Sequence, residues 1–483
     1  MTESGDFAAR HVLHSRDGEL ADAAPRTTPA QVRAMVRRAG ESPRGLVLYV
    51  HGGLVGTPAA IETAKAMAPS IEESGGYPVF LVWETGLIGS LLDAFTGPAR
   101  SIFGRLADAV AGLPALSTSA GVRADDPRSQ LAARLRADPQ LVADLERAAR
   151  TPPRNAEQGA GDILTGVSSD RDALTPATYR AIFGVGGDPR AALPLDPFDR
   201  FLAFAFGILD ELRAREPYGR LHGPRQSVLE ECVRAVGAGT AAWDDMKADA
   251  DRNLGPTGAV TLLLDAIRER ADGGARQLPV TVIAHSAGSV IACHLIERWQ
   301  GGSPSGRLDV VLLAPSVSTE RFARTLRADA AAPQITGLRI FTMTDAAERA
   351  DALPTTTQRL YEHSLLYFVS GACESRPDQA WGVRADVPLS GMRRFADAEE
   401  LTPSSRLRSG WEDQTPLVTR AEYAAIRAVE RGLAADPDRL VLTPTGADAP
   451  AGRRSSARSH EGFVWGTWDS IRHIVANGLA DGG

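Results

Sequence analysis

Ser286 lies in Ala284-His285-Ser286-Ala287-Gly288, where an apolar run ends and a helical pattern begins. A serine hydroxyl becomes a good nucleophile only when a nearby base removes its proton, and a histidine oriented by a carboxylate is the common base. Ala284 and Gly288 stand two positions before and after the serine, where larger side chains would prevent a sharp turn from strand to helix. The pattern therefore predicts a strand, a tight turn with Ser286 at its apex, and a helix. The alternative is a small-residue turn around a buried serine.

This segment resembles the nucleophile elbow of the serine α/β-hydrolase superfamily, whose pattern is G-x-S-x-G, with alanine at the first position here. A second segment, His51-Gly52-Gly53-Leu54, resembles the HGGG segment of lipases and esterases, with Leu54 replacing the third glycine. The resemblance implies an oxyanion hole formed by the backbone N–H groups of Gly53, Leu54 and Ala287. Taken alone, the second segment is equally compatible with an ordinary turn at the end of a strand.

The resemblance also implies an acid after the nucleophile and a histidine after the acid. Asp345 follows the apolar run 338–344, and strand ends in this fold commonly supply the acid. It is therefore the expected acid, although an aspartate there is also an ordinary helix N-cap. Asp351, Glu348 and Glu320 could supply the acid instead.

His460 is the expected general base, because it lies on a loop just before the final helical pattern. Its surroundings resemble an S-H-G-G-F segment of some hydrolases, with Glu461 replacing a glycine. A loop histidine without a role is the alternative. We expect His285 to pack or position its neighbours locally. Three further histidines fit helices or buried segments better than a catalytic loop: His294, His363 and His473.

Nearly unbroken apolar runs predict the strands that position these residues, since strands of a parallel sheet with helices on both faces are continuously apolar. The sequence thus indicates an α/β protein with a doubly wound, mostly parallel sheet, and the resemblance implies the α/β-hydrolase fold with a large, mainly helical cap insertion. A closing helix is expected from Trp468, with Thr467 as N-cap and Gly478 beyond its end. The predicted strands are 45–50, 78–83, 279–284, 308–314 and 338–344, with a weaker sixth at 439–443.

Long stretches without strand patterns divide the chain. We expect a partly disordered N-terminal segment at 1–44, a core formed by 45–86 and 279–483 with a smaller insertion at about 346–438, and a helical cap or lid at 87–278. Two apolar segments, 86–95 and 201–209, are candidates for a lid or a substrate channel; packing inside the helical insertion is the simpler interpretation. Helix starts inside the insertion are predicted at Asp138-Pro139, Thr175-Pro176 and Asp196-Pro197.

The composition is that of an ordinary globular chain. Its 483 residues carry a formal net charge of -7, which gives no basic footprint for nucleic acid or an anionic membrane. The three cysteines, Cys232, Cys293 and Cys373, lack metal-ligand spacing and do not form a disulfide framework. We expect a cytoplasmic protein without stable membrane insertion, cofactor or metal, whose partner is a small-molecule or lipid-like acyl substrate.

The expected function is a serine hydrolase that cleaves an ester or related acyl bond through a covalent acyl-enzyme, most simply like a carboxylesterase or lipase. Thioesterase, amidase and peptidase activities use the same residues and stay open. A catalytically silent scaffold with the same fold is the second hypothesis, and a displaced Asp345 or His460 would favour it. A nucleotide-binding domain is a weaker rival, because the glycine spacing and the lysine of a phosphate-binding loop are missing.

Overall fold

The structure is a computed structural model that describes residues 3–84, 97–113, 126–152, 173–184, 196–215, 222–300, 306–331, 335–353, 361–374, 386–396 and 420–479. This part of the chain contains an eight-stranded sheet in the order β2-β1-β4-β3-β5-β6-β7-β8. Only the β1–β2 pair is antiparallel. The strands are β1 (Val12–Arg16), β2 (Glu19–Leu20), β3 (Leu46–Val50), β4 (Tyr77–Trp83), β5 (Val280–His285), β6 (Leu308–Leu313), β7 (Ile335–Met343) and β8 (Leu440–Thr443).

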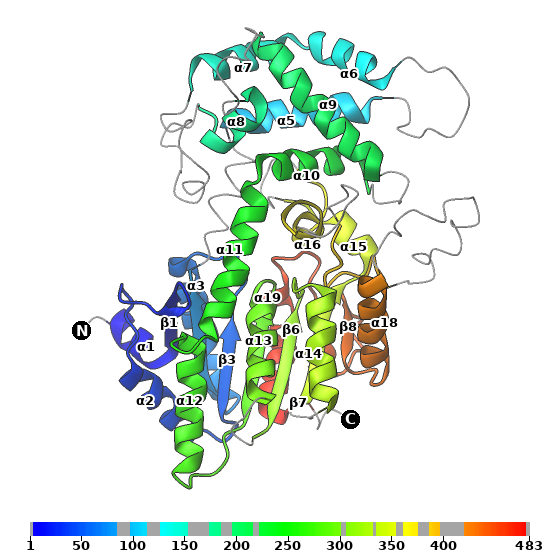
Figure 1. Cartoon of the computed structure of the whole chain (residues 1–483). Helices are drawn as coiled ribbons and strands as arrows, with labels where there is room; N and C mark the ends of the chain where they lie inside the picture. The colour runs from blue at the N-terminus through cyan, green and yellow to red at the C-terminus, as the bar shows by residue number, and fades with distance from the viewer. Residues whose placement is uncertain are drawn as a thin grey trace.

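Helices cover both faces of this sheet, so the α/β, doubly wound prediction is confirmed (Figure 1). One face carries α12 (Ala259–Asp272), α13 (Gly288–Gln300) and α14 (Thr319–Ala331), with α2 (Pro29–Ala39) beside α12. The other face carries α3 (Thr57–Glu73) and α20 (Trp468–Asn477), which contact each other. Strands β3, β4, β5 and β6 are buried at every residue, which explains their unbroken apolar sequences.

The N-terminal segment differs from the prediction, because it is ordered and belongs to the sheet. Helix α1 (Glu3–His11) leads into β1, which pairs in parallel with β4 from Val12 to Ser15. The strand was missed because its sequence, VLHSR, contains polar residues that are nevertheless buried: the His14 side chain faces the Pro25 carbonyl oxygen at 2.9 Å. Satisfied polar groups of this kind can occupy a strand without an apolar signal.

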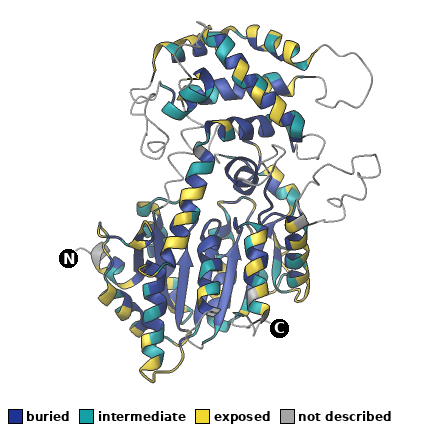
Figure 2. Cartoon of the chain, viewed as in Figure 1, coloured by how far each residue is buried: buried dark blue, intermediate teal, exposed yellow. Residues whose placement is uncertain are grey.

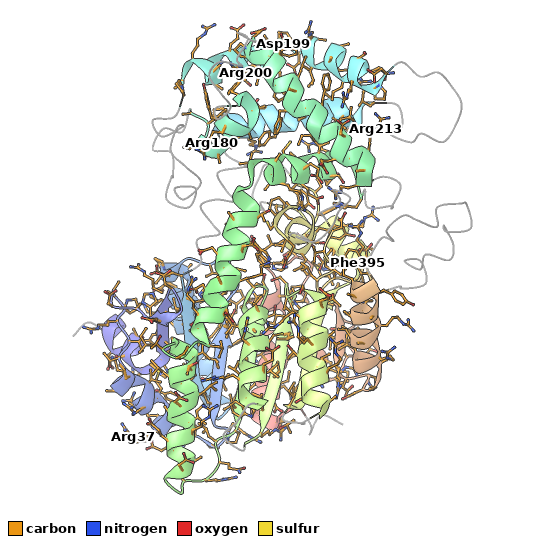
Figure 3. All side chains as sticks on the ribbon, in the orientation of Figure 1. Arg37, Arg180, Asp199, Arg200, Arg213 and Phe395 are labelled. Atoms are coloured by element: carbon orange, nitrogen blue, oxygen red, sulfur yellow. The ribbon has the colours of Figure 1, made fainter. Side chains whose placement is uncertain are left out.

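A helical unit stands above the carboxyl end of the sheet (Figure 1). Its helices are α5 (Gly97–Ala111), α6 (Pro127–Arg136), α7 (Pro139–Arg150), α8 (Pro176–Phe183), α9 (Pro197–Arg215) and α10 (Pro224–Val236). Helix α9 is amphipathic: Phe201 and Leu209 are buried inside the unit, whereas polar side chains such as Asp199 and Arg213 lie along the same helix (Figures 2 and 3). The helical content predicted for this stretch is confirmed.

Beyond α10, the long insertion leads from this unit down onto the sheet. Helix α11 (Ala238–Asn253) descends to contact α13, and α12 contacts α2 and β1. Gly18 shows how close this packing is, because an added Cβ would lie 2.3 Å from Arg252. The expected insertion boundary at residue 278 is therefore replaced by one near Gly237, where α10 ends in the left-handed conformation.

The helix starts predicted inside the insertion are found: the Asp138 and Thr175 side chains cap α7 and α8, and α9 begins at Pro197. At the start of α2, Thr28 forms a full capping box with Gln31. Helix α3 begins at Thr57, with Gly56 as N-cap. Thr467 occupies the N-cap position of α20, but its hydroxyl pairs with Ser455 at 2.9 Å and leaves the helix without a side-chain cap.

The second insertion contains short helices between β7 and β8. These are α15 (Asp345–Ala350), α16 (Leu365–Phe368), a π-helical turn η3 (Val369–Cys373) and α18 (Arg420–Ala434). After β8 come the short helices η5 (Ala451–Arg453) and α19 (Phe463–Gly466). Among the described residues, none of the helices has the length and apolar character needed to cross a membrane.

Candidate active site

Ser286 sits at the apex of the predicted strand-turn-helix, between the end of β5 and the start of α13. Its φ is +51°, a left-handed backbone conformation that costs a non-glycine residue about 1–2 kcal/mol. Backbone hydrogen bonds hold it there: its N–H donates to Leu313 O at 2.9 Å, and its carbonyl accepts from the Ser289 hydroxyl at 2.6 Å. A strained serine that its surroundings fix in place is a mark of functional sites.

The small residues around Ser286 are required by close packing. A Cβ added to Gly288 would lie 2.7 Å from the carbonyl oxygen of Val50 in β3. Ala284 is fully buried. A Cβ added to Gly52 would lie 3.1 Å from the Cβ of Ser286, so the 51–54 loop passes directly beside the serine. The turn and this loop were predicted separately, and the fold brings them together.

The 51–54 loop is fixed by His51. Its Nδ1 faces Gly52 O at 2.7 Å, and its Nε2 lies 3.3 Å from the backbone N–H of Trp83. These partners define a neutral imidazole that carries its proton on Nδ1, and burial lowers the pKa of His51 to about 4. Among the described residues, the backbone N–H groups of Leu54 and Ala287 have no protein acceptor, as donors of an oxyanion hole require.

His460 reaches the same place from the C-terminal loop. It is 2 % exposed, and neither ring nitrogen has a hydrogen-bond partner among the described residues. Its ring lies 5.2 Å from that of His285, whose Nε2 faces the carbonyl oxygen of His460 at 3.3 Å. Burial, reinforced by repulsion from His285, lowers the pKa of His460 well below its usual value, so the ring is neutral at neutral pH.

The carboxylates are arranged differently from the expectation. Asp345 is the first residue of α15, and its carboxylate accepts a 2.6 Å hydrogen bond from the Tyr367 hydroxyl, with no bond to His460 among the described residues. Asp351, by contrast, accepts a 2.8 Å hydrogen bond from the backbone N–H of His460. Glu348 is buried beside Ser364, and Glu320 lies in the first turn of α14.

A cavity of about 240 Å³ opens beside Ser286 and His460. It is bounded by β3 and β4 on the sheet, by α3 on one side, and by Val464 and the half-exposed Trp465 of the short helix α19. Gly53 and Leu54 line it as well. Serine, histidine and the proposed oxyanion loop therefore share one small, mostly apolar space.

Of the two apolar segments considered as a lid or a substrate channel, only one is described by the structure. Residues 86–95 lie outside the described residues. Residues 201–209 form the middle of α9 and pack inside the helical unit, and none of them lines the cavity. Leu365 of the second insertion does line it and was not foreseen, because nothing in the pattern of residues 361–368 shows on which surface they pack.

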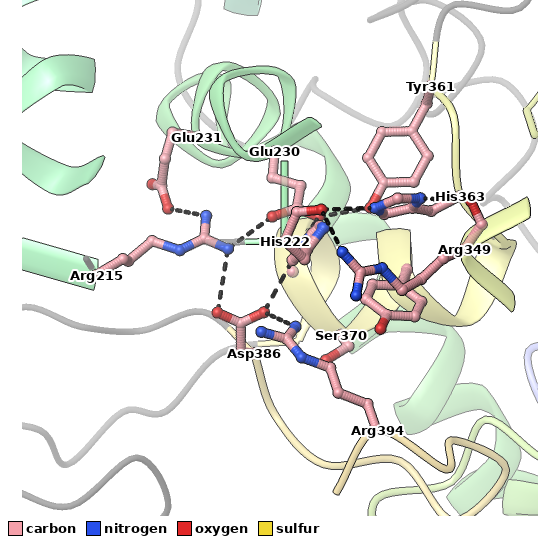
Figure 4. Close-up of polar contacts among 12 residues, drawn as sticks. Arg215, His222, Glu230, Glu231, Arg349, Tyr361, His363, Ser370, Asp386 and Arg394 are labelled. Carbon is pink, nitrogen blue, oxygen red and sulfur yellow. Dashed lines mark hydrogen bonds and ion pairs between the residues drawn. The ribbon is translucent and has the colours of Figure 1, made fainter. Parts of the chain in front are cut away.

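A second buried polar cluster lies where α9 and α10 of the helical unit meet residues of the second insertion, and it was also missed (Figure 4). At its centre, Arg215 of α9 contacts Glu230 at 2.7 Å, Glu231 at 2.8 Å and Asp386 at 3.1 Å. Arg394 contacts Asp386 at 2.9 Å. A sequence signal existed, since Glu230 and Glu231 interrupt the otherwise apolar run VLEECV, where an unpaired charge would be costly.

This ionic cluster also contains a group with metal-ligand atoms: His222, Glu230 and Asp386 each offer one within 4.8 Å of the others. Both carboxylates are already held by guanidinium groups. Burial alone would raise the pKa of Glu230. Attraction to His222 and Arg215 outweighs this effect and lowers the pKa to about 2. With Arg234, whose Nε lies 3.8 Å from Glu231, three guanidinium groups face three carboxylates, so these residues fit a structural ion cluster better than a metal centre.

Comparisons with known proteins add no family to this description. No protein-family model matches the chain, and searches of curated proteins and of solved structures found no significant match.

Proposed function

We propose that the protein is a serine hydrolase that cleaves an ester or related acyl bond, with Ser286 as nucleophile and His460 as general base. The observation that carries this proposal is the pairing of a strained serine with a buried histidine whose two ring nitrogens have no partner among the described residues, both facing one cavity. Two unpaired nitrogens on a ring beside the serine and the cavity leave the imidazole able to take a proton and bond a ligand, as a general base must.

In the proposed reaction, His460 takes the proton of Ser286 as the serine oxygen attacks the acyl carbonyl. The bond to the leaving group breaks as His460 returns the proton to that group, and an acyl-serine remains. Water, deprotonated by the same histidine, then attacks the acyl-serine and releases the acid. The N–H groups of Gly53, Leu54 and Ala287, with the N-terminus of α13, stabilise the oxyanion in both steps. No cofactor takes part.

For the acid, we propose Asp351 in place of Asp345. Asp351 is already bonded to the backbone of His460, whereas Asp345 is bonded to Tyr367. A change in the His460 side-chain rotamer on substrate binding would bring Nδ1 to this carboxylate, and catalytic hydrogen bonds often tighten only in the substrate complex. That bond would raise the pKa of His460 from its lowered value and make it a stronger base.

The α/β-hydrolase fold and the cap belong to the same proposal. The helical unit of α5 to α10 would act as a cap that shields the carboxyl edge of the sheet, while the immediate cavity is formed by the core and Leu365. The three cysteines are buried and unpaired, which supports a reducing, cytoplasmic location.

One observation favours the second candidate, a catalytically silent scaffold. Because no carboxylate among the described residues contacts a ring nitrogen of His460, the histidine lacks the partner that orients a catalytic base. In that case the cavity would bind a ligand without turnover.

Covalent labelling separates these candidates. Intact-protein mass after incubation with a fluorophosphonate should show one adduct on the wild type, none on Ser286→Ala and strongly slowed labelling on His460→Ala. Asp351→Asn should slow labelling by about 10²–10⁴-fold and the matched Asp345→Asn by less than about threefold. No adduct on the wild type would support the silent scaffold, and a larger loss in Asp345→Asn would return the acid to that residue.

A further inference from the structure

The cavity beside Ser286 contains a polar group that the proposed mechanism does not use. Tyr49 lines the cavity, is 4 % exposed, and its hydroxyl has no hydrogen-bond partner among the described residues. Burial alone raises its pKa, so the phenol is neutral and can donate a hydrogen bond. Because this hydroxyl lines the cavity and has no protein partner among the residues described there, it can donate a hydrogen bond to a group bound in the cavity.

The direction of the Tyr49 side chain follows from the strand. Side chains alternate between the two faces of a sheet, and Val50 faces α13, since its Cγ1 lies 3.0 Å from a Cβ built on Gly288. Tyr49 therefore faces α3, together with Phe80, whose ring centroid is 6.0 Å away. Thr63 of α3 lines the same cavity and adds a second hydroxyl with no hydrogen-bond partner among the described residues.

The cavity also limits the size and charge of its occupant. Its volume of about 240 Å³ lies below the range of roughly 300–1,000 Å³ typical of drug-sized ligands, so it fits a short chain. No lysine or arginine is among the described residues that line it, and the carboxylate of Glu461 belongs to an exposed residue. An anionic group would therefore find no counter-charge there.

The sheet register gives the backbone positions of Tyr49 and the serine. Tyr49 pairs with Ile283, three residues before Ser286, so the two backbone positions lie about 10 Å apart along the strand direction. An acyl chain that runs through the cavity from Ser286 towards Tyr49 would therefore meet the tyrosine beyond its carbonyl, several bonds along the chain.

Building on the proposed function, we infer that the cavity binds a short, uncharged acyl chain with an oxygen several bonds from the scissile carbonyl, and that the hydroxyl groups of Tyr49 and Thr63 donate hydrogen bonds to this oxygen. The protein would prefer such an oxygenated acyl ester to its plain aliphatic analogue. A site built to hydrogen-bond one group rejects the analogue that lacks it, because its own polar atoms then stay unpaired.

The test is a matched pair of p-nitrophenyl esters, 5-oxohexanoate and 5-methylhexanoate, in which a ketone oxygen is exchanged for a methyl group at the same position. The ratio of kcat/KM for the two esters is measured for the wild type, Tyr49→Phe and Thr63→Val. We expect the wild type to favour the 5-oxo ester by about tenfold or more, Tyr49→Phe to lose most of this preference, and Thr63→Val to lose part of it. Tyr77→Phe is the control, because the Tyr77 hydroxyl bonds Arg10 O at 2.6 Å, away from the cavity, and its ratio should stay at the wild-type value.

Fluorophosphonate labelling of each variant tests the serine hydrolase proposal separately from the preference for an oxygenated acyl chain. A wild type that labels and hydrolyses both esters, but shows no preference or keeps it in Tyr49→Phe, overturns this inference and leaves the serine hydrolase standing. A wild type that neither labels nor hydrolyses either ester overturns both.

Discussion

Two buried polar clusters lie within one chain, and they are built in opposite ways. Around Arg215, every charged group faces an opposite charge: one guanidinium contacts three carboxylates, and Arg394 holds Asp386 from another side. Around Ser286, the polar groups are neutral histidines and hydroxyls. There the ring nitrogens of His460 and the hydroxyl of Tyr49 lack partners among the described residues.

This difference indicates that the polar groups around Arg215 hold the fold together, whereas those around Ser286 fit a binding or catalytic site. Breaking a buried ion cluster leaves an uncompensated charge, so the Arg215 cluster fixes how α9 and α10 sit on residues 361–374 and 386–394. The Ser286 cluster instead keeps unpaired groups and backbone strain next to a cavity, which reduces stability and leaves those groups ready for a ligand. Substitutions in the first should therefore change stability, and substitutions in the second should change activity.

The largest effect is expected for Ser286→Gly. Esterase activity should fall by at least about 10⁴-fold, while the free energy of unfolding rises by about 1 kcal/mol, because glycine adopts the φ of +51° without strain. Denaturant unfolding and ester hydrolysis measure the two effects. Ser286→Ala is the control that loses activity without this gain, and equal stability of the two variants would show that the serine is not strained.

Arg215→Met is the counterpart in the ionic cluster. It should lower the free energy of unfolding by about 3–5 kcal/mol, since Glu230 and Asp386 lose a partner in a site that is 1 % exposed or less. Urea unfolding gives the value. The matched variant Arg33→Met removes an exposed ion pair with Glu269 and should leave the urea midpoint of unfolding almost unchanged. Similar losses in the two would argue against a special role for the buried cluster.

A smaller effect is expected from pH. The pKa values of His51 and His285 are lowered to about 4, so the unfolded chain binds more protons than the folded one below pH 6.5. Their contribution to stability is complete above pH 6.5 and is lost as pH falls towards 4, by up to about 1.4 kcal/mol per pH unit for each histidine. Burial raises the pKa of Glu348 to about 8, so its contribution to stability falls as pH rises, opposite to that of the histidines. The quantity to measure is therefore the difference between wild type and variant in how the free energy of unfolding changes with pH. His51→Gln should flatten this slope, and an unchanged slope would contradict the lowered pKa of His51.

The smallest effect concerns the helical unit. Ala203→Glu places a charge on the exposed side of α9, away from the cavity lining. Ester hydrolysis should change by less than about twofold, and equally for short and long acyl chains. A selective loss on long chains would instead show that α9 contacts the substrate.

Much of the fold follows from sequence patterns, because continuous apolar strands and helix caps are local signals. The predicted runs at β3, β4, β5, β6, β7 and β8 match the sheet. The turn at Ser286 was also visible, since small residues at fixed spacing leave few other conformations. By contrast, β1 was missed, because its polar residues His14 and Ser15 are buried. The partners of His14 are Pro25 and Glu84, which come from other segments.

The site itself was only partly predictable. Ser286, Gly53, Leu54 and His460 do line one cavity, because motif positions are tied to strand ends. The choice between Asp345 and Asp351 could not be made from sequence. Both follow β7 within a few residues, and the first turn of α15 and the contact with Tyr367 direct Asp345 elsewhere.

The places of α3 and α20 in the sequence have a consequence for folding during synthesis. Both helices lie on one face of the sheet, and a 3.0 Å hydrogen bond links Trp468 of α20 to Ser70 of α3, 398 residues earlier in the chain. The part of this face that α20 covers therefore stays exposed while the intervening residues are made. Chaperone demand should be greatest during that interval.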